Sequence, residues 1–155
     1  MKKTISLLLT MFFTLATIFV FTSCQSKPSP LTEIEKIVGK PSEDILSDDT
    51  YKVSNSIGDI KIVRKTTNDV FGIVGEITIF ILSDEKYIDI VTWQSTNKSP
   101  LTEKEIKTFV DGMKEIYGKP IDSSKNNYMW QNDELGINLK IDENEVYLTF
   151  VNNQE

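Results

Sequence analysis

The sequence predicts an α+β fold: an antiparallel β-sheet of about six or seven strands, with one long and one short helix on one face. Three observations support this prediction. One segment repeats apolar residues at helical spacing, several others alternate or run as β-branched stretches, and Gly, Pro, Asn and Asp residues separate them. The chain of 155 residues is long enough to bury the core of one domain.

The first predicted element is a short helix over residues 32–38. Thr32 and Glu35 have the spacing of a capping box, in which two side chains satisfy free backbone N–H groups at a helix start. Gly39 and Pro41 follow at positions where helices end. The apolar side of this helix consists of Leu31, Ile34, Ile37 and Val38.

The next segments are predicted strands. Residues 51–53 and 60–64 form a first pair, and residues 73–82 are a long apolar and β-branched run. The polar residues 83–86 then turn the chain into a further strand at 87–94. These segments supply the first half of the predicted sheet.

Alternation along residues 87–94 suggests a binding face. If Ile88 and Ile90 point toward the helices, Tyr87 and Trp93 lie on the outer face of the sheet. Trp93 is then the best single candidate for a partner-binding residue, with Tyr87 beside it, because aromatic residues anchor many interfaces. The alternative is that these rings fill the core, with their polar tips at its edge.

The clearest predicted helix covers residues 102–117. Thr102 and Glu105 form a second capping box, and Gly118 marks the end of the helix. Gly112 inside the helix costs about 1 kcal/mol relative to Ala, which suggests a close packing contact. The apolar stripe consists of Ile106, Phe109, Val110, Met113, Ile116 and Tyr117.

The last third of the chain again reads as strands, at residues 128–131, 135–141 and 146–151. Residues 142–145 form a predicted hairpin turn between the last two. The alternation at 135–141 is that of a half-buried antiparallel strand. Its buried side is predicted to consist of Leu135, Ile137, Leu139 and Ile141.

Two short motifs recur in the chain. Residues 29–33 are identical to residues 99–103, and the Gly-Lys-Pro at 39–41 returns at 118–120. Either a helix-then-hairpin module was duplicated, or helix starts and stops converged on the same residues. The layout resembles, in outline, the repeated domain of β-lactamase inhibitor protein and the small lipoprotein of the outer-membrane β-barrel assembly machine. This resemblance implies an architecture and transfers no functional residue.

The residue types argue against catalysis. The chain has no histidine, a single cysteine and no Gly-rich phosphate-binding motif. We therefore expect no enzymatic activity, no metal and no cofactor. The acidic residues at 48–49 and 142–145 lack the order of a calcium loop and are interpreted as solvated turns. A carboxylate-based hydrolase is the least favoured alternative.

Residues 1–24 have the pattern of a bacterial secretory signal. Lys2 and Lys3 precede an apolar run, and two small residues stand directly before Cys24. This pattern resembles the lipobox of bacterial lipoproteins, in which the cysteine is linked to diacylglycerol and the signal is removed. A retained membrane helix is the alternative interpretation.

The lipoprotein interpretation divides the chain into three parts. Residues 1–23 are a cleaved signal peptide, residues 24–30 are a lipidated tether, and residues 31–155 are a single α+β domain. Acyl chains on Cys24 would hold the protein to the cell membrane or the outer membrane, facing the periplasm or the cell exterior.

Charge narrows the choice of partners. After residues 1–23 are removed, 15 basic and 23 acidic side chains remain, a net charge of −8. Such a surface repels phosphate backbones, so we expect no nucleic-acid binding. The leading expectation is a membrane-anchored, non-catalytic binding or scaffold lipoprotein with an envelope protein as partner. The alternative is a lipoprotein inhibitor or immunity protein that neutralises a toxin or hydrolase.

Overall fold

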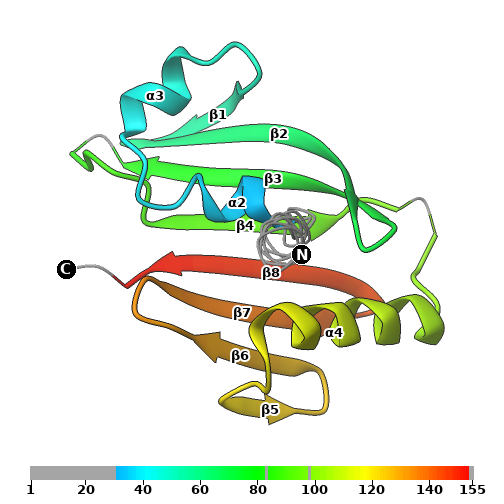
Figure 1. Cartoon of the computed structure of the whole chain (residues 1–155). Coiled ribbons are helices and arrows are strands. Elements are labelled where there is room, and N and C mark those ends of the chain that lie inside the picture. The colour runs from blue at the N-terminus through cyan, green and yellow to red at the C-terminus, as the bar shows by residue number, and fades with distance from the viewer. Residues whose placement is uncertain (1–30, 83, 98, 154–155) are drawn as a thin grey trace, which may run out of the picture.

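Eight strands form one antiparallel sheet in a computed structural model, which describes residues 31–82, 84–97 and 99–153 (Figure 1). The strand order is β1-β2-β3-β4-β8-β7-β6-β5. The predicted α+β class and antiparallel sheet are confirmed, whereas the predicted number of strands was too low. The strands are β1 (Lys52–Ile57), β2 (Ile60–Val70), β3 (Ile73–Leu82), β4 (Ile90–Ser95), β5 (Asp122–Ser124), β6 (Asn127–Gln131), β7 (Leu135–Asp142) and β8 (Glu145–Asn152).

The sheet consists of two meanders of four strands. Strands β1 to β4 pair in sequence order, and so do β5 to β8. The two meanders meet where β4 pairs with β8, with Thr92 opposite Thr149. The two outermost strands, β1 and β5, are therefore the first strands of their meanders.

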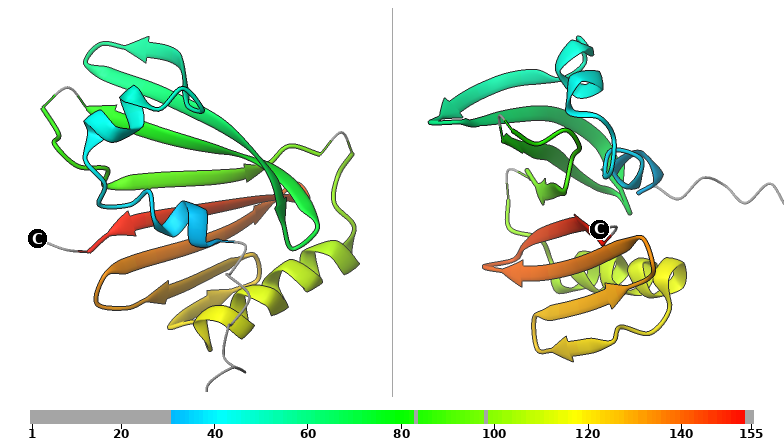
Figure 2. Two further views of the ribbon diagram at one scale, coloured as in Figure 1. Left: turned by 45° about the horizontal axis from the view of Figure 1, so that its top comes forward. Right: turned by 90° about the vertical axis from the view of Figure 1, so that its left-hand side faces the viewer.

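Three helices accompany the sheet: α2 (Thr32–Glu35), α3 (Ser42–Ser47) and α4 (Glu103–Tyr117). Figures 1 and 2 show α2 and α4 on the same side of the sheet, with α3 near β1. Helix α4 begins with the predicted capping box. The Thr102 N–H donates to the Glu105 carboxylate at 2.8 Å, and the Glu105 N–H donates to Thr102 Oγ1 at 3.3 Å. At its other end, helix α4 stops at Gly118, which has a φ of 77°.

Helix α4 packs through the stripe that the sequence predicts. Phe109, Val110 and Met113 are buried in the core. The Phe109 ring stacks on Trp93 of β4 at a centroid distance of 5.5 Å. Gly112 meets the ring of Phe71, which a Cβ atom would overlap, so the predicted close contact at this glycine is confirmed.

The first helical region differs from the prediction. Helix α2 ends at Glu35 rather than Val38, and Thr32 does not cap it, because Leu31 is the N-cap residue and no side-chain cap is formed. The chain beyond α2 instead pairs with a distant segment: the Gly39 N–H donates to the Ile88 carbonyl at 2.8 Å. This pairing competes with extension of the helix.

Two further elements were not predicted. Helix α3 starts directly after Pro41, whose fixed φ suits the residue before a helix. Strand β5 has only three residues, all polar and exposed, and so carries no apolar pattern. Strand β2 also runs six residues beyond the predicted end at Arg64, to Val70.

The core lies between the sheet and the helices. Alternate residues of the central strands point into it, including the predicted row on β7, where Ile137 and Leu139 are buried and Leu135 is partly buried. Trp130 is also buried, and its indole N–H donates to the Gly118 carbonyl at 2.9 Å. The polar tip of this ring is therefore satisfied at the end of α4.

Candidate functional site

Trp93 does not lie on the outer face of the sheet. Its side chain is 0% exposed and stacks on Phe109. The predicted alternation fails because residues 87–89 are not regular strand. The Ile88 N–H donates to the Lys40 carbonyl, and the strand begins only at Ile90, so that Ile88 and Val91 are both buried. Trp93 is a core residue, as the alternative interpretation holds, and its predicted place on the outer face is wrong.

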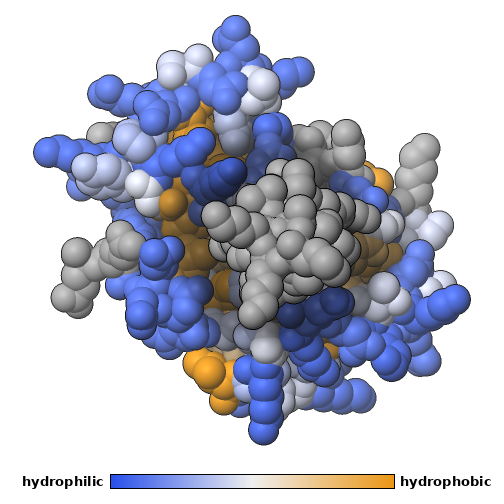
Figure 3. All heavy atoms as spheres, in the orientation of Figure 1, coloured by the Kyte–Doolittle hydropathy of each residue, from blue (hydrophilic) through white to orange (hydrophobic). Residues whose placement is uncertain are grey.

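Tyr87, in contrast, is 56% exposed. It lines a cleft of about 600 Å³ between α3, the end of β3 and the loop before β4. Leu46, Ile81 and Leu82 contribute apolar walls, and charged residues of both signs, including Lys61 and Glu85, also line the cleft. Apolar surface is visible near α3 in the space-filling view (Figure 3). A role of Tyr87 in partner binding stays a prediction.

The sheet has a second face, which α2 and α4 leave open in the described part of the chain (Figure 2). Strand register places Ile62 opposite Phe80, and Ile90 opposite Val151. Phe80 follows the Ile79–Val91 pair and is therefore level with Ile90. These four side chains form one row across β2, β3, β4 and β8.

A second apolar row lies beside the first, nearer the end of the sheet. Ile57 pairs with Ile60, and Ile60 pairs with Leu82. In the first row, Phe80 is 39% exposed and Ile90 is 42% exposed, so that row is accessible to solvent. We call both rows together the apolar patch: Ile57, Ile60, Ile62, Phe80, Leu82, Ile90 and Val151.

The apolar patch is unusual for a solvated sheet face. On β3, Ile79 and Ile81 already supply the core, yet Phe80 and Leu82 on the opposite face are also apolar. A strand that is apolar on both faces is typical of a sheet covered on both sides. Contiguous exposed apolar surface marks interaction sites on soluble proteins.

The other half of the open face is mostly polar, with Val74 and Met129 as isolated exposed apolar side chains. Arg64 and Glu76 form an ion pair at 3.5 Å, and Lys140 and Asp142 form one at 2.7 Å. The Thr92 hydroxyl donates to the Thr78 carbonyl at 3.2 Å. These groups pair with one another as on an ordinary solvent-facing sheet, which confines the apolar patch to one end.

Acidic loops surround that end. The β1–β2 turn, the loop between β3 and β4 and the β6–β7 turn all lie where the apolar patch ends. These three loops hold only one basic residue, Lys86. Their acidic residues are Asp59, Asp84, Glu85, Asp89, Asp133 and Glu134. The accessible apolar surface is therefore bordered by negative charge.

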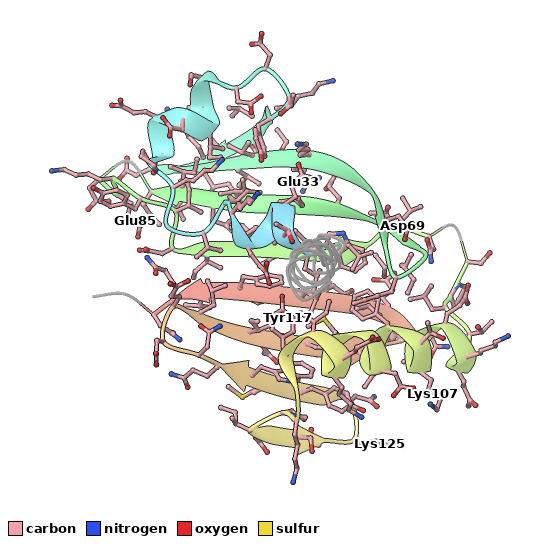
Figure 4. All side chains as sticks on the ribbon, in the orientation of Figure 1. Glu33, Asp69, Glu85, Lys107, Tyr117 and Lys125 are labelled. Atoms are coloured by element: carbon pink, nitrogen blue, oxygen red, sulfur yellow. The ribbon has the colours of Figure 1, made fainter. Side chains whose placement is uncertain are left out.

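The titratable groups under α2 form contacts between elements. The Tyr117 hydroxyl donates to the Glu35 carboxylate and thereby connects α4 to α2 (Figure 4). Burial, reinforced by this hydrogen bond, raises the pKa of Tyr117 well above its usual value. Glu33 forms an ion pair with Lys65 of β2, and that hydrogen bond raises the pKa of Lys65.

The described residues contain no cluster of three or more His, Cys, Asp or Glu side chains that could hold a metal ion. The acidic segments considered as calcium loops form turns. The Asp48 carboxylate accepts hydrogen bonds from the Thr50 N–H and hydroxyl. Glu143 and Asn144 have φ values of 47° and 66°, as in a two-residue hairpin turn.

Cys24, the predicted signal peptide and the tether lie outside the described residues. Within the described part of the chain, no helix is both long and apolar enough to cross a membrane.

The apolar patch could have been found from the sequence. The alternation that buries Ile77, Ile79 and Ile81 necessarily turns Phe80 and Leu82 to the other face. Its extension to Ile90 could not have been found, because the irregular residues 87–89 reverse the alternation of β4.

Comparison of the chain with models of protein families, with curated proteins and with solved structures found no match.

Proposed function

We propose that this protein is a non-catalytic binding or scaffold module of the bacterial cell envelope, and that it binds a protein partner through the open face of its sheet. One observation carries the proposal: the apolar patch is exposed on a face that no described helix covers. Buried against a partner, such side chains gain about 25 cal/mol per Å² of apolar surface.

The proposed location follows from the N-terminal sequence. A lipid on Cys24 and the tether at 24–30 would hold the domain at the cell membrane or the outer membrane, facing the periplasm or the cell exterior. An anchored module meets partners in a restricted volume, so that moderate affinity is enough for occupancy.

We also propose that the domain arose by duplication of a helix-and-meander module. Each half runs from a helix into four strands in sequence order, and the halves meet at β4 and β8. Leu31 and Leu101, in the recurring motif, are both buried at the start of a helix. Gly39 and Gly118, in the second motif, both have a φ of 77°.

An inhibitor or immunity protein is the second candidate function. The acidic loops around the apolar patch favour it, because negative charge steers a basic toxin or hydrolase to its inhibitor. A single stoichiometric partner whose association rate falls with added salt would select this function over a scaffold.

Site-specific photo-crosslinking in intact cells tests the proposed surface. The full chain would carry benzoylphenylalanine at position 90, in the apolar patch, or at position 121 as a matched control. Ile121 is 65% exposed and apolar but lies outside the apolar patch. We expect position 90 alone to crosslink reproducibly to an envelope protein. Equal crosslinking at both positions, or none at position 90, would contradict the proposal.

A further inference from the structure

We infer that the apolar patch binds a cationic polypeptide that presents apolar side chains beside Lys or Arg. This inference rests on the proposed function and adds the chemistry of the partner. It combines two features of one end of the sheet, the exposed apolar rows and the carboxylates that border them.

The apolar rows and an acidic loop lie at the same end of the sheet, where they could contact the apolar and the cationic side chains of such a polypeptide. Phe80 and Ile90 lie level on neighbouring strands and offer adjacent apolar contacts. Asp84, Glu85 and Asp89 belong to the loop that joins those same two strands. A segment lying across β3 and β4 could therefore place apolar side chains on the rows and cationic ones against this loop.

A lipid surface fits this site less well. Anionic head groups would meet the acidic loops and be repelled. The chain also enters the described domain at Leu31, which is buried in the core at the start of α2, on the helix side of the sheet. A tether of seven residues reaches at most about 25 Å. It would hold the helix side toward the membrane and leave the apolar patch facing away.

A second copy of the chain also fits less well. Two copies that bury the apolar patch against itself would bring two sets of acidic loops together. Six carboxylates and one lysine lie in those loops of each copy. Like charges at a close interface disfavour association, whereas a cationic partner neutralises the same groups.

The test uses the full chain in zwitterionic phosphatidylcholine nanodiscs and two fluorescent ten-residue peptides. One peptide alternates Leu and Lys, and the other alternates Leu and Glu. Anisotropy titrations, with empty nanodiscs as the blank, measure each affinity. We expect the cationic peptide to bind at least about tenfold more tightly than the anionic one. Its affinity should fall as NaCl rises from about 0.05 M to about 0.5 M, because the Debye length shortens.

Variants locate the binding. Phe80→Ser and Ile90→Ser should each weaken binding of the cationic peptide roughly tenfold, as truncation of an interface anchor does. Ile121→Ser, the matched exposed control, should leave it unchanged. The double variant Asp84→Asn/Glu85→Gln should reduce the preference for the cationic peptide. Far-UV circular dichroism and thermal unfolding of each variant confirm that these exposed substitutions leave the fold intact.

Four results would overturn the inference: equal binding of both peptides, binding of neither, insensitivity to Phe80→Ser and Ile90→Ser, or binding of the protein without peptide to vesicles of phosphatidylglycerol that Phe80→Ser abolishes. Concentration-dependent dimerisation lost in Phe80→Ser would assign the patch to a second copy instead. Crosslinking at position 90 without a cationic preference would sink this inference and leave the proposed function standing. Preferential binding of the cationic peptide without crosslinking at position 90 would contradict the proposed partner in cells and leave the binding chemistry of the apolar patch standing.

Discussion

Gly75 lies directly against the indole ring of Trp93 in the core. A Cβ atom at this position would overlap the ring, and Trp93 is fully buried and stacked on Phe109. The ring therefore has no free space into which it could move. The glycine in the middle of an apolar strand is explained by this contact with a large neighbour.

We predict that Gly75→Ala destabilises the protein by about 1–3 kcal/mol, the usual cost of overpacking a core. Urea denaturation measures the change. Gly136→Ala on β7 is the matched control, because its nearest neighbour, at 3.3 Å, is the Asn153 side chain, which moves at the cost of at most one exposed hydrogen bond to the Asn132 carbonyl. The control should be neutral or gain up to about 1 kcal/mol from lost unfolded-state entropy. Equal losses in both variants would refute this account of Gly75.

Tyr117 makes the free energy of unfolding depend on pH in the alkaline range. Burial raises the pKa of its phenol above the ordinary value near 10, and the bond to Glu35 adds to the effect. The folded state thus holds this proton more tightly than the unfolded chain. The stabilisation is complete below pH about 10 and is lost as the pH rises above that value.

We predict that the free energy of unfolding of the wild type falls above pH about 10, and that Tyr117→Phe makes this fall shallower. Denaturant titrations from about pH 8 to about pH 11, a range that includes the ordinary tyrosine pKa near 10, supply the comparison. Glu35→Gln keeps an acceptor but removes the charge, so it should give an intermediate slope. If the free energy of unfolding falls with pH as steeply in Tyr117→Phe as in the wild type, Tyr117 is not the cause of the fall.

At the scale of elements, the same four-residue motif behaves differently in two places. Thr102 caps α4, whereas Thr32 caps nothing, although a Glu follows each at the same spacing. The first turn of α4, like that of any helix, has free N–H groups, and Thr102 has the extended backbone from which an N-cap side chain can reach one of them. Helix α2 stops after four residues, and its N-cap Leu31 already has helical backbone angles.

We predict that Thr102→Ala costs about 1 kcal/mol of stability, as loss of an N-cap side chain does. Thr32→Ala should change the stability by no more than about 0.5 kcal/mol, since no cap is lost. Thermal unfolding of the two variants side by side makes the comparison. A larger loss at Thr32 than at Thr102 would contradict the assigned caps.

Which elements could be predicted depended on where their signals lie. Helix α4 and strand β7 were predicted well, because their caps, stripes and alternation are contained in the segment itself. The start of β4 could not be predicted, since the irregular backbone at Ile88 is held by Lys40, 48 positions earlier. This and the other distant contacts of residues 39–42 with the segment before β4 reverse the alternation and place Trp93 in the core.

At the scale of the whole molecule, both edges of the sheet are protected. Strand β1 has a register shift between Val53 and Asn55, and β5 is short and polar. Bulges and short polar edges hinder edge-to-edge pairing between sheets. Association through the face of the sheet is thereby favoured over association through its edges, which agrees with a binding role for the apolar patch.

The proposed attachment to a membrane is also tested on the whole chain. We predict that metabolic labelling with a fatty acid marks the wild type and not Cys24→Ala, because the chain has no other cysteine. Autoradiography of the immunoprecipitated protein reads out the label. Ser26→Ala, two residues further on, should remain labelled. Persistent label in Cys24→Ala would remove the basis for anchoring.

The position of β8 has a consequence for the order in which the protein can fold. Strand β8 is the last of the described strands in sequence, yet it pairs with both β4 and β7 at the centre of the sheet, and Val146, Leu148 and Phe150 are all buried. Until it is present, the two halves have no shared strand pair and each leaves a central edge open. The described sheet therefore stays incomplete until β8 has been synthesised, a property that suits the proposed translocation in an unfolded form. It also makes a premature stop before β8 far more damaging than the loss of an equally long edge strand.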